Sequence, residues 1–152
     1  MLTRFEQFTA AISGIYRSIQ KIERDEMEKF GLKGAYAQYL LAMTRHPNGI
    51  TAADLSETCD KDKAAISRIL SEMEAKGLVA REIGKSGPYR AMIRLTDAGK
   101  TAAHYVQEKA TAAVTIAGGS LSENDRKAMY EILYSIADRL QLICKDGITV
   151  QP

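Results

Sequence analysis

One side of the stretch Asp62–Val79, which reads DKAAISRILSEMEAKGLV, combines small, hydroxylated and basic side chains. If the stretch is a helix, Ile66, Leu70 and Met73 lie on one apolar stripe, at spacings of three and four, that packs against a core. The other side of its first two turns carries Ala64, Ser67, Arg68 and Ser71, with Ala65 beside them, and Lys63 stands near the helix start. Solvated helix faces are usually rich in charged residues, so this composition indicates a face that another molecule approaches closely.

These side chains have the sizes and hydrogen-bonding groups that reading double-stranded DNA requires. A helix in the major groove brings its backbone near base edges, and Ala64 and Ala65 are small enough to allow that approach. Arg68 is long enough to pair with guanine through two hydrogen bonds or to bind phosphate. Ser67 and Ser71 are donors for a base or a phosphate, and Lys63 near the helix start suits a phosphate. The alternative is an exposed helix whose residues are small by chance.

The elements before this stretch place it in a helix-turn-helix. Thr51 is predicted to cap a short helix over AADLSETC, residues 52–59, with Asp54 as the partner residue of a capping box. The letters DKD then form a tight turn, and Asp62 is the predicted N-cap of the second helix. A short helix, a turn of about three or four residues and an amphipathic helix in succession are typical of this motif.

The elements after it alternate like strands. LVAREI and YRAMIRL are predicted to pair as a β-hairpin around the Gly-rich tip GKSGP. Ala91 and Ile93 share one face of the second strand. The tip is basic, and Lys85, Tyr89 and Arg90 are expected to lie near the DNA backbone or the minor groove.

The remaining chain is predicted to be helical. An amphipathic helix runs from Phe5 to about Phe30, a second follows over residues 36–43, and two long helices begin at caps Thr96 and Ser122. The predicted fold is therefore mainly α with a small β-hairpin, an α+β arrangement.

Composition restricts the class of protein. The chain has 152 residues, 45% hydrophobic and 26% charged, which is typical of one globular domain. The net charge is only +2, but residues 61–100 hold nine Lys or Arg against five Asp or Glu. A local basic patch of this kind is typical of phosphate-contacting surfaces. Two distant cysteines, no export signal and no membrane-length apolar run favour a reduced, cytoplasmic protein that does not bind membranes.

The motifs in this order resemble the MarR family of winged helix-turn-helix regulators. ITAADLSET is similar to the third helix of the family, DKAAISRILSEMEAKGLV to its recognition helix, and RLTDAGK to the L-T-x-x-G motif that closes the wing. The resemblance implies a single MarR-like domain over residues 1–152. Its DNA-binding lobe is expected at about 34–100, and its dimerisation helices at about 1–33 with 101–152.

The terminal helices are expected to pair with a second copy of the chain. The first helix is too apolar over its length for a small winged domain to cover, and the last helix carries a further stripe. That stripe consists of Met129, Ile132, Leu133, Ile136, Leu140 and Ile143. The alternative is packing within one chain. The resemblance favours a homodimer.

The resemblance also implies an effector pocket between the dimer helices and the DNA-binding lobe. Five residues are expected to line it: Ile12, Tyr16, Tyr36, Tyr39 and Leu40. Tyrosine suits a small aromatic or phenolic ligand because it offers an apolar ring and one orienting hydroxyl. The same residues suit ordinary core packing, and that alternative stays open.

The expected function is that of a sequence-specific transcriptional regulator, a homodimeric repressor that binds an inverted-repeat operator in double-stranded DNA. No catalytic constellation is visible, so we do not expect an enzyme. His46 and His104 lie far apart without companion ligands, so no metal and no cofactor are expected. The alternative function is a winged-helix module for protein contacts without a specific DNA target.

Overall fold

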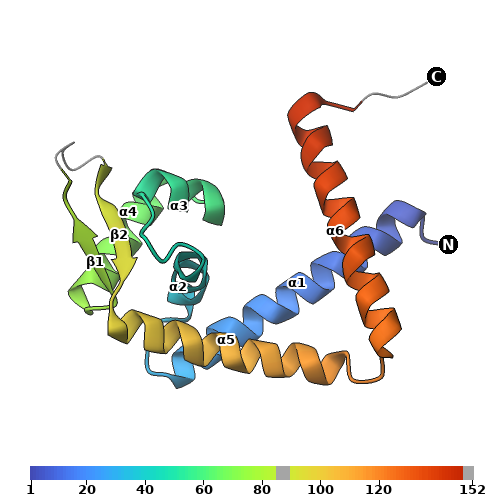
Figure 1. The fold of residues 1–152 in the computed structure, drawn as a ribbon, viewed down its shortest axis with the longest axis horizontal. Coiled ribbons are helices and arrows are strands. Elements are labelled where there is room, and N and C mark those ends of the chain that lie inside the picture. Colours follow the sequence, from blue (N-terminus) through green and yellow to red (C-terminus); the bar gives the residue numbers. More distant parts are fainter. Residues whose placement is uncertain (85–89, 149–152) are drawn as a thin grey trace. The chain divides into compact units, whose positions relative to one another are not determined.

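The computed structural model describes residues 1–84 and 90–148, and it has the predicted order of helices around one hairpin (Figure 1). The elements are α1 (Arg4–Lys29), a 3-10 turn η1 (Gly34–Tyr36), α2 (Ala37–Thr44), α3 (Ala52–Cys59), α4 (Lys63–Ala75), β1 (Val79–Glu82), β2 (Met92–Leu95), α5 (Asp97–Ala117) and α6 (Glu123–Asp146). The expected fold class, mainly helical with a two-stranded hairpin, is confirmed.

Helix starts follow the capping residues that the sequence contains. Five helices begin with a side-chain oxygen that accepts a hydrogen bond from the backbone N–H three residues on, namely at Thr3, Thr51, Asp62, Thr96 and Ser122. At Thr51 the hydroxyl donates to the Asp54 carboxylate at 2.8 Å, whereas a capping box needs that carboxylate to accept from a backbone N–H. The complete capping box is formed by Thr3 and Glu6 at the start of α1.

The chain divides into two compact units, Met1–Ala113 and Val114–Pro152. The division falls within α5, between Ala113 and Val114. The reason lies in the core of the first unit, which α1 and α5 both enter: Met27, Ala102, Ala103 and Val106 are buried there. Residues of α2, α3, α4 and the hairpin complete the same core, with Tyr36, Leu40, Leu55, Ile66, Leu70, Met73 and Ile93 almost fully buried.

The hairpin packs its inner face on this core. β1 and β2 are antiparallel with Val79 opposite Leu95 and Glu82 opposite Met92, and Ile50 adds an isolated bridge to Ile93. Ala91 and Ile93 are buried, as the alternation of the sequence predicted.

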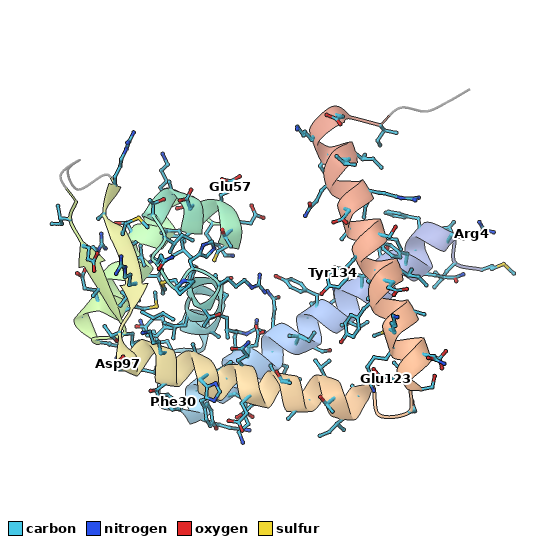
Figure 2. The ribbon with its side chains drawn as sticks, in the orientation of Figure 1. Arg4, Phe30, Glu57, Asp97, Glu123 and Tyr134 are labelled. Carbon is cyan, nitrogen blue, oxygen red and sulfur yellow. The ribbon has the colours of Figure 1, made fainter. Side chains whose placement is uncertain are left out.

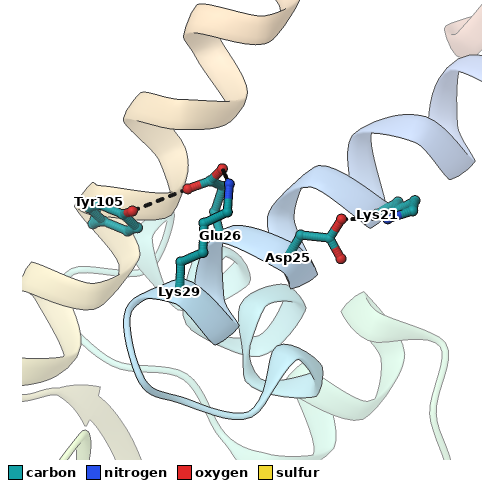
Figure 3. Close-up of polar contacts among 5 residues, drawn as sticks. All are labelled: Lys21, Asp25, Glu26, Lys29 and Tyr105. Carbon is teal, nitrogen blue, oxygen red and sulfur yellow. Dashed lines mark hydrogen bonds and ion pairs between the residues drawn. The ribbon is translucent and has the colours of Figure 1, made fainter.

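The second half of α1 is joined to α5 within the first unit. The Tyr105 hydroxyl donates to Glu26 at 3.1 Å, and Lys29 pairs with the same carboxylate at 2.8 Å (Figure 3). The Phe30 ring lies 5.1 Å from that of Tyr105, next to α5 (Figure 2). The hydrogen bond from Lys29, followed by that from Tyr105, lowers the pKa of the Glu26 carboxyl. These contacts hold the C-terminal end of α1 against α5.

The first half of α1 exposes large apolar side chains. These side chains are Phe5, Phe8, Ile12, Ile15 and Tyr16. Helices stabilised within a protomer bury such residues, so this half of α1 is an apolar surface that the described part of its own unit leaves open.

The second unit shows the same property more strongly. The structure describes all of α6, and none of its residues is buried. Its exposed apolar residues include Ile132, Leu133, Leu140 and Ile143 of the predicted stripe. A long helix with an uncovered apolar stripe needs a partner surface to be stable in water.

Candidate nucleic-acid interface

The helix-turn-helix is held together by its own turn. Asp60 ends α3 in the left-handed conformation, with φ of 51°, which lets the chain reverse direction within a few residues. The Lys61 N–H donates to the Ser56 carbonyl at 3.0 Å, and the Ser56 hydroxyl donates to the Lys61 carbonyl. Asp62 then accepts from the Ala65 N–H at 2.8 Å and starts α4. The turn thereby fixes the direction of α4 relative to α3.

α4 presents the predicted face to solvent. Ile66, Leu70 and Met73 are buried at 0–1% exposure, which settles which side of the helix is internal. The opposite side carries Ala64, Ser67, Arg68 and Ser71, all exposed, with the half-buried Ala65 beside them, and Lys63 is exposed at the helix start. The structure therefore leaves all six helix residues of the predicted DNA-binding set at least partly exposed.

Two of these residues differ in how free they are to form contacts. The Ser71 hydroxyl donates to the Ser67 carbonyl at 3.0 Å, so its proton is already engaged and its lone pairs remain as acceptors. Within the described residues, no carboxylate lies within ion-pair distance of the Arg68 guanidinium. Arg68 is consequently the donor on this face that is best placed to reach a base or a phosphate.

The hairpin contributes one predicted residue to the described surface. Arg90 is exposed, whereas Lys85 and Tyr89 lie outside the described residues. The strands that carry the tip are braced by ion pairs that the sequence did not predict. Arg81 on β1 pairs with Glu74 on α4 at 3.0 Å, and Arg94 on β2 pairs with Glu82 at 3.3 Å.

Arg94 also joins the hairpin to the turn before α3. Its Nε donates to the Asn48 carbonyl at 3.1 Å, across 46 positions of sequence. The alternation in YRAMIRL placed Arg94 on the outer face, but nothing in the local pattern indicates its partners. These contacts fix the hairpin against the helix-turn-helix, so the two surfaces can bind one ligand as a unit.

The five residues expected to line an effector pocket lie in two environments. Tyr36, Tyr39 and Leu40 are buried at 0–5% exposure in the core of the first unit, while Ile12 and Tyr16 are exposed on α1. The Tyr36 hydroxyl donates to Glu72 at 3.2 Å. Burial, followed by this hydrogen bond, raises the pKa of the Tyr36 phenol. The three residues after α1 thus pack as core residues do.

A cavity of about 190 Å³ lies elsewhere in the same unit. Its lining is polar and comes from α1, the start of α2 and the helix-turn-helix turn: Gln20, Glu23, Arg24, Gly34, Ala35, Ala37, Gln38 and Lys61. Burial raises the pKa of the Glu23 carboxyl, and the charges of Arg45 and Arg24 oppose that shift. The cavity lining therefore includes one partly desolvated acid, Glu23, and two cationic residues, Arg24 and Lys61.

The cysteines and histidines form no site of their own in the part of the chain that the structure describes. Cys59 is half-buried at the end of α3, and burial raises the pKa of its thiol, while the charge of Lys61 lowers it. Cys144 is exposed on α6. Residues 1–84 and 90–148 contain no group of three potential metal ligands. In the same ranges, the helices are too short or too polar to cross a bilayer.

Comparison with known sequences finds similarity over the region that contains α2, α3 and α4. The model of the MarR family matches residues 30–86. The HTH-type transcriptional regulator Rv1719 of Mycobacterium tuberculosis is 39% identical over 54 residues, which are 36% of this chain and 20% of that protein. The uncharacterized HTH-type transcriptional regulator YdgJ of Bacillus subtilis is 24% identical over 104 residues, 68% of this chain and 63% of that protein. The chain thus spans less than two thirds of either curated relative.

Solved structures extend the likeness to nearly the whole chain at the level of fold. The crystal structure of MarR superimposes with a TM-score of 0.79 at 21% identity, covering 96% of this chain and 99% of that chain. A putative MarR family transcriptional regulator from Listeria monocytogenes, solved in complex with 26mer DNA, gives a TM-score of 0.75 at 17% identity over 100% of both chains.

Proposed function

From a chain whose residues 30–86 carry the MarR family domain and whose fold is that of solved MarR family structures, we infer a transcriptional regulator that binds double-stranded DNA. One observation carries the inference most directly. α4 buries its apolar stripe and exposes small residues around Arg68, a surface shaped for close approach to base edges. The Listeria monocytogenes structure contains DNA, and its fold is shared by this chain.

We propose that the active form is a homodimer that represses transcription from an inverted-repeat operator. The uncovered apolar residues of α1 and α6 support the dimer, because each surface lacks a partner within its own unit. A two-fold axis would present two copies of α4 to successive major grooves about 34 Å apart. Half-site centres are then expected to be spaced by roughly 10 bp or a small multiple. Lys85, Tyr89 and Arg90 are proposed to contact the backbone or minor groove beside each half-site.

Replacing Arg68 tests the reading surface. Arg68→Ala should weaken specific binding by about 1–3 kcal/mol if the guanidinium pairs with a base, and it should relax preference at one position in each half-site. Duplexes selected from a random pool by the wild-type protein provide the operator, and titrations against single-base variants measure the preference. A uniform loss on all duplexes would make Arg68 a phosphate contact. Binding unchanged in both affinity and preference would contradict the proposed role of α4.

The second candidate function, a winged-helix module for protein contacts, makes a different prediction in the same experiment. Such a module does not need a helix face with small residues around an exposed arginine. Its wild-type form would enrich no duplex from the random pool. The exposed Arg68 surface favours the DNA-binding function.

We propose that a small aromatic or phenolic acid regulates this binding. Ile12 and Tyr16 were the exposed members of the expected pocket, and Tyr16, Gln20 and Glu23 follow one another at spacings of four and three on one face of α1. Gln20 and Glu23 line the cavity of about 190 Å³, where Arg24 and Lys61 suit an anionic group. Because Lys61 belongs to the helix-turn-helix turn, a ligand bound there favours one position of α3 and α4 over another.

Truncating Tyr16 tests the effector site. A binding compound from a panel of benzoates and phenols should raise the melting temperature and weaken operator binding together. Tyr16→Ala should remove both responses and keep DNA affinity without ligand, because Tyr16 is 61% exposed and contributes little to the core. Tyr16 also belongs to the apolar surface of α1, so Phe5→Ala, which removes another aromatic ring from that surface at 74% exposure, controls for any effect on the dimer. A panel in which no compound shifts both quantities would contradict the effector while leaving the DNA-binding proposal intact.

A further inference from the structure

Glu72 on α4 is held from outside its own helix. Lys33, which precedes η1, donates from Nζ to Glu72 Oε2 at 2.8 Å. The Tyr36 hydroxyl donates to the same oxygen at 3.2 Å. Because Tyr36 is buried and α4 packs on the same core, the carboxylate is fixed at the edge of the reading surface.

Arg68 lies one helical turn before this carboxylate. Residues four apart are neighbours on a helix surface, so an Arg68 side chain can reach Glu72. The hydrogen bond of Lys33 lowers the pKa of Glu72 most; the Lys33 charge, the Tyr36 hydrogen bond and, last, the Arg68 charge lower it further, while burial opposes the shift. The structure nevertheless pairs Glu72 with Lys33, and no ion pair joins it to Arg68 among the described residues.

We propose that Lys33 is a positioning residue for DNA recognition: by occupying Glu72, it prevents this carboxylate from capturing Arg68 and so leaves the guanidinium available to DNA. The inference rests on the proposed function and adds a residue that touches no DNA. It explains how an acid can stand one turn from the main donor of a DNA-reading helix.

The physical basis is competition for one guanidinium. A carboxylate accepts the forked donors of Arg through two parallel hydrogen bonds, the same geometry that guanine or phosphate offers. If Lys33 is removed, Glu72 keeps its charge but loses the partner that it holds at 2.8 Å. Arg68 lies one turn earlier on α4 and can then pair with it. The Arg68 guanidinium must then break its ion pair with Glu72 before it can bind DNA. The free energy of breaking this pair lowers the affinity for DNA.

Removing Lys33 also removes a positive charge from a DNA-binding lobe, and the experiment must separate this from capture. A long-range charge effect persists whether or not Arg68 is present, whereas capture requires Arg68. The two causes therefore differ in additivity. Lys29→Met is the matched control, since Lys29 also pairs with a glutamate, Glu26, at 2.8 Å and is not part of the reading surface.

The test is a mutant cycle on the full chain, using the duplex that the wild-type protein selects. Lys33→Met should lower the affinity of a dimer by about 2- to 5-fold, and it should relax preference at the base position that Arg68→Ala relaxes. Adding Glu72→Gln should restore both, because a neutral amide does not hold a guanidinium as a carboxylate does. Lys33→Arg should bind like the wild type, and Lys29→Met should too.

The decisive measurement is Lys33→Met in the Arg68→Ala background, where it should have no further effect on affinity. An additive loss there, or a Lys33→Met loss that Glu72→Gln does not reverse, would overturn the positioning role. Melting temperatures of all variants identify any that lose affinity through unfolding. A wild-type protein that selects no duplex would overturn the proposed function itself. A Lys33→Met protein with unchanged affinity and base preference would overturn only the positioning role.

Discussion

Leu133→Glu is expected to convert the dimer into a monomer and to abolish tight operator binding, although every proposed DNA contact remains. Leu133 lies in the α6 stripe with Ile132, Ile136 and Leu140, and it is 36% exposed in the protomer. A carboxylate there costs the isolated protomer little, because the site is open to water. In a dimer interface the same charge would be buried without a partner, which costs several kcal/mol.

The loss of binding follows from the loss of the second reading head. One α4 helix contacts one half-site, and linking two heads raises their effective concentration on a two-fold operator by orders of magnitude. Sedimentation velocity measures the oligomeric state, and titration with the selected duplex measures affinity. Ser135→Glu is the matched control: it adds the same charge to α6 outside the stripe, with Arg139 one turn on. A Leu133→Glu protein that stays dimeric and binds tightly would contradict the proposed interface.

Features that depend on neighbouring residues were predictable from the sequence. The caps at Thr51, Asp62, Thr96 and Ser122 depend on one side chain and an N–H three residues away, so the local letters suffice. The buried stripe of α4 and the alternation of β2 depend on helical and strand periods alone. The same periods placed Arg68 and Ser67 on the accessible side of α4.

Features that depend on distant residues were not. Lys33 and Glu72 are 39 positions apart, and Arg94 is 46 positions from Asn48. No period relates such pairs, because tertiary packing alone decides which side chains meet. The tyrosines show the same limit: the sequence suits Tyr36 and Tyr39 equally to an effector pocket and to core packing, and which of the two holds depends on what packs against them. The structure packs both in the core.

Gly99 combines the two cases. The sequence shows that Gly99 belongs to the LTDAG motif. The structure shows why glycine is needed there: the start of α5 meets the turn that follows α4. Thr96 closes this junction: its N–H donates to the Leu78 carbonyl at 3.0 Å, and its hydroxyl donates to the Gly77 carbonyl. A Cβ on Gly99 would lie 2.0 Å from the Leu78 carbonyl oxygen, a distance that no side chain can occupy. The helix start therefore packs directly on backbone, and only glycine allows it.

Gly99→Ala should therefore destabilise the fold by at least about 1–3 kcal/mol, because the clashing atom belongs to backbone and cannot rotate away. Gly14→Ala gives the opposite expectation, since nothing lies within 4 Å of that Cβ and alanine stabilises a helix interior by about 0.5–1 kcal/mol. Both glycines are helical, so the difference in sign isolates the contact with Leu78. Urea denaturation measures both variants. Operator affinity of Gly99→Ala should fall as well, because the shifted junction moves the hairpin that begins at Val79 relative to α4. Equal stability of Gly99→Ala and Gly14→Ala would show that the junction can open to accept a Cβ. It would contradict the proposal that Gly99 is needed for the close packing of α5 on the turn between α4 and β1.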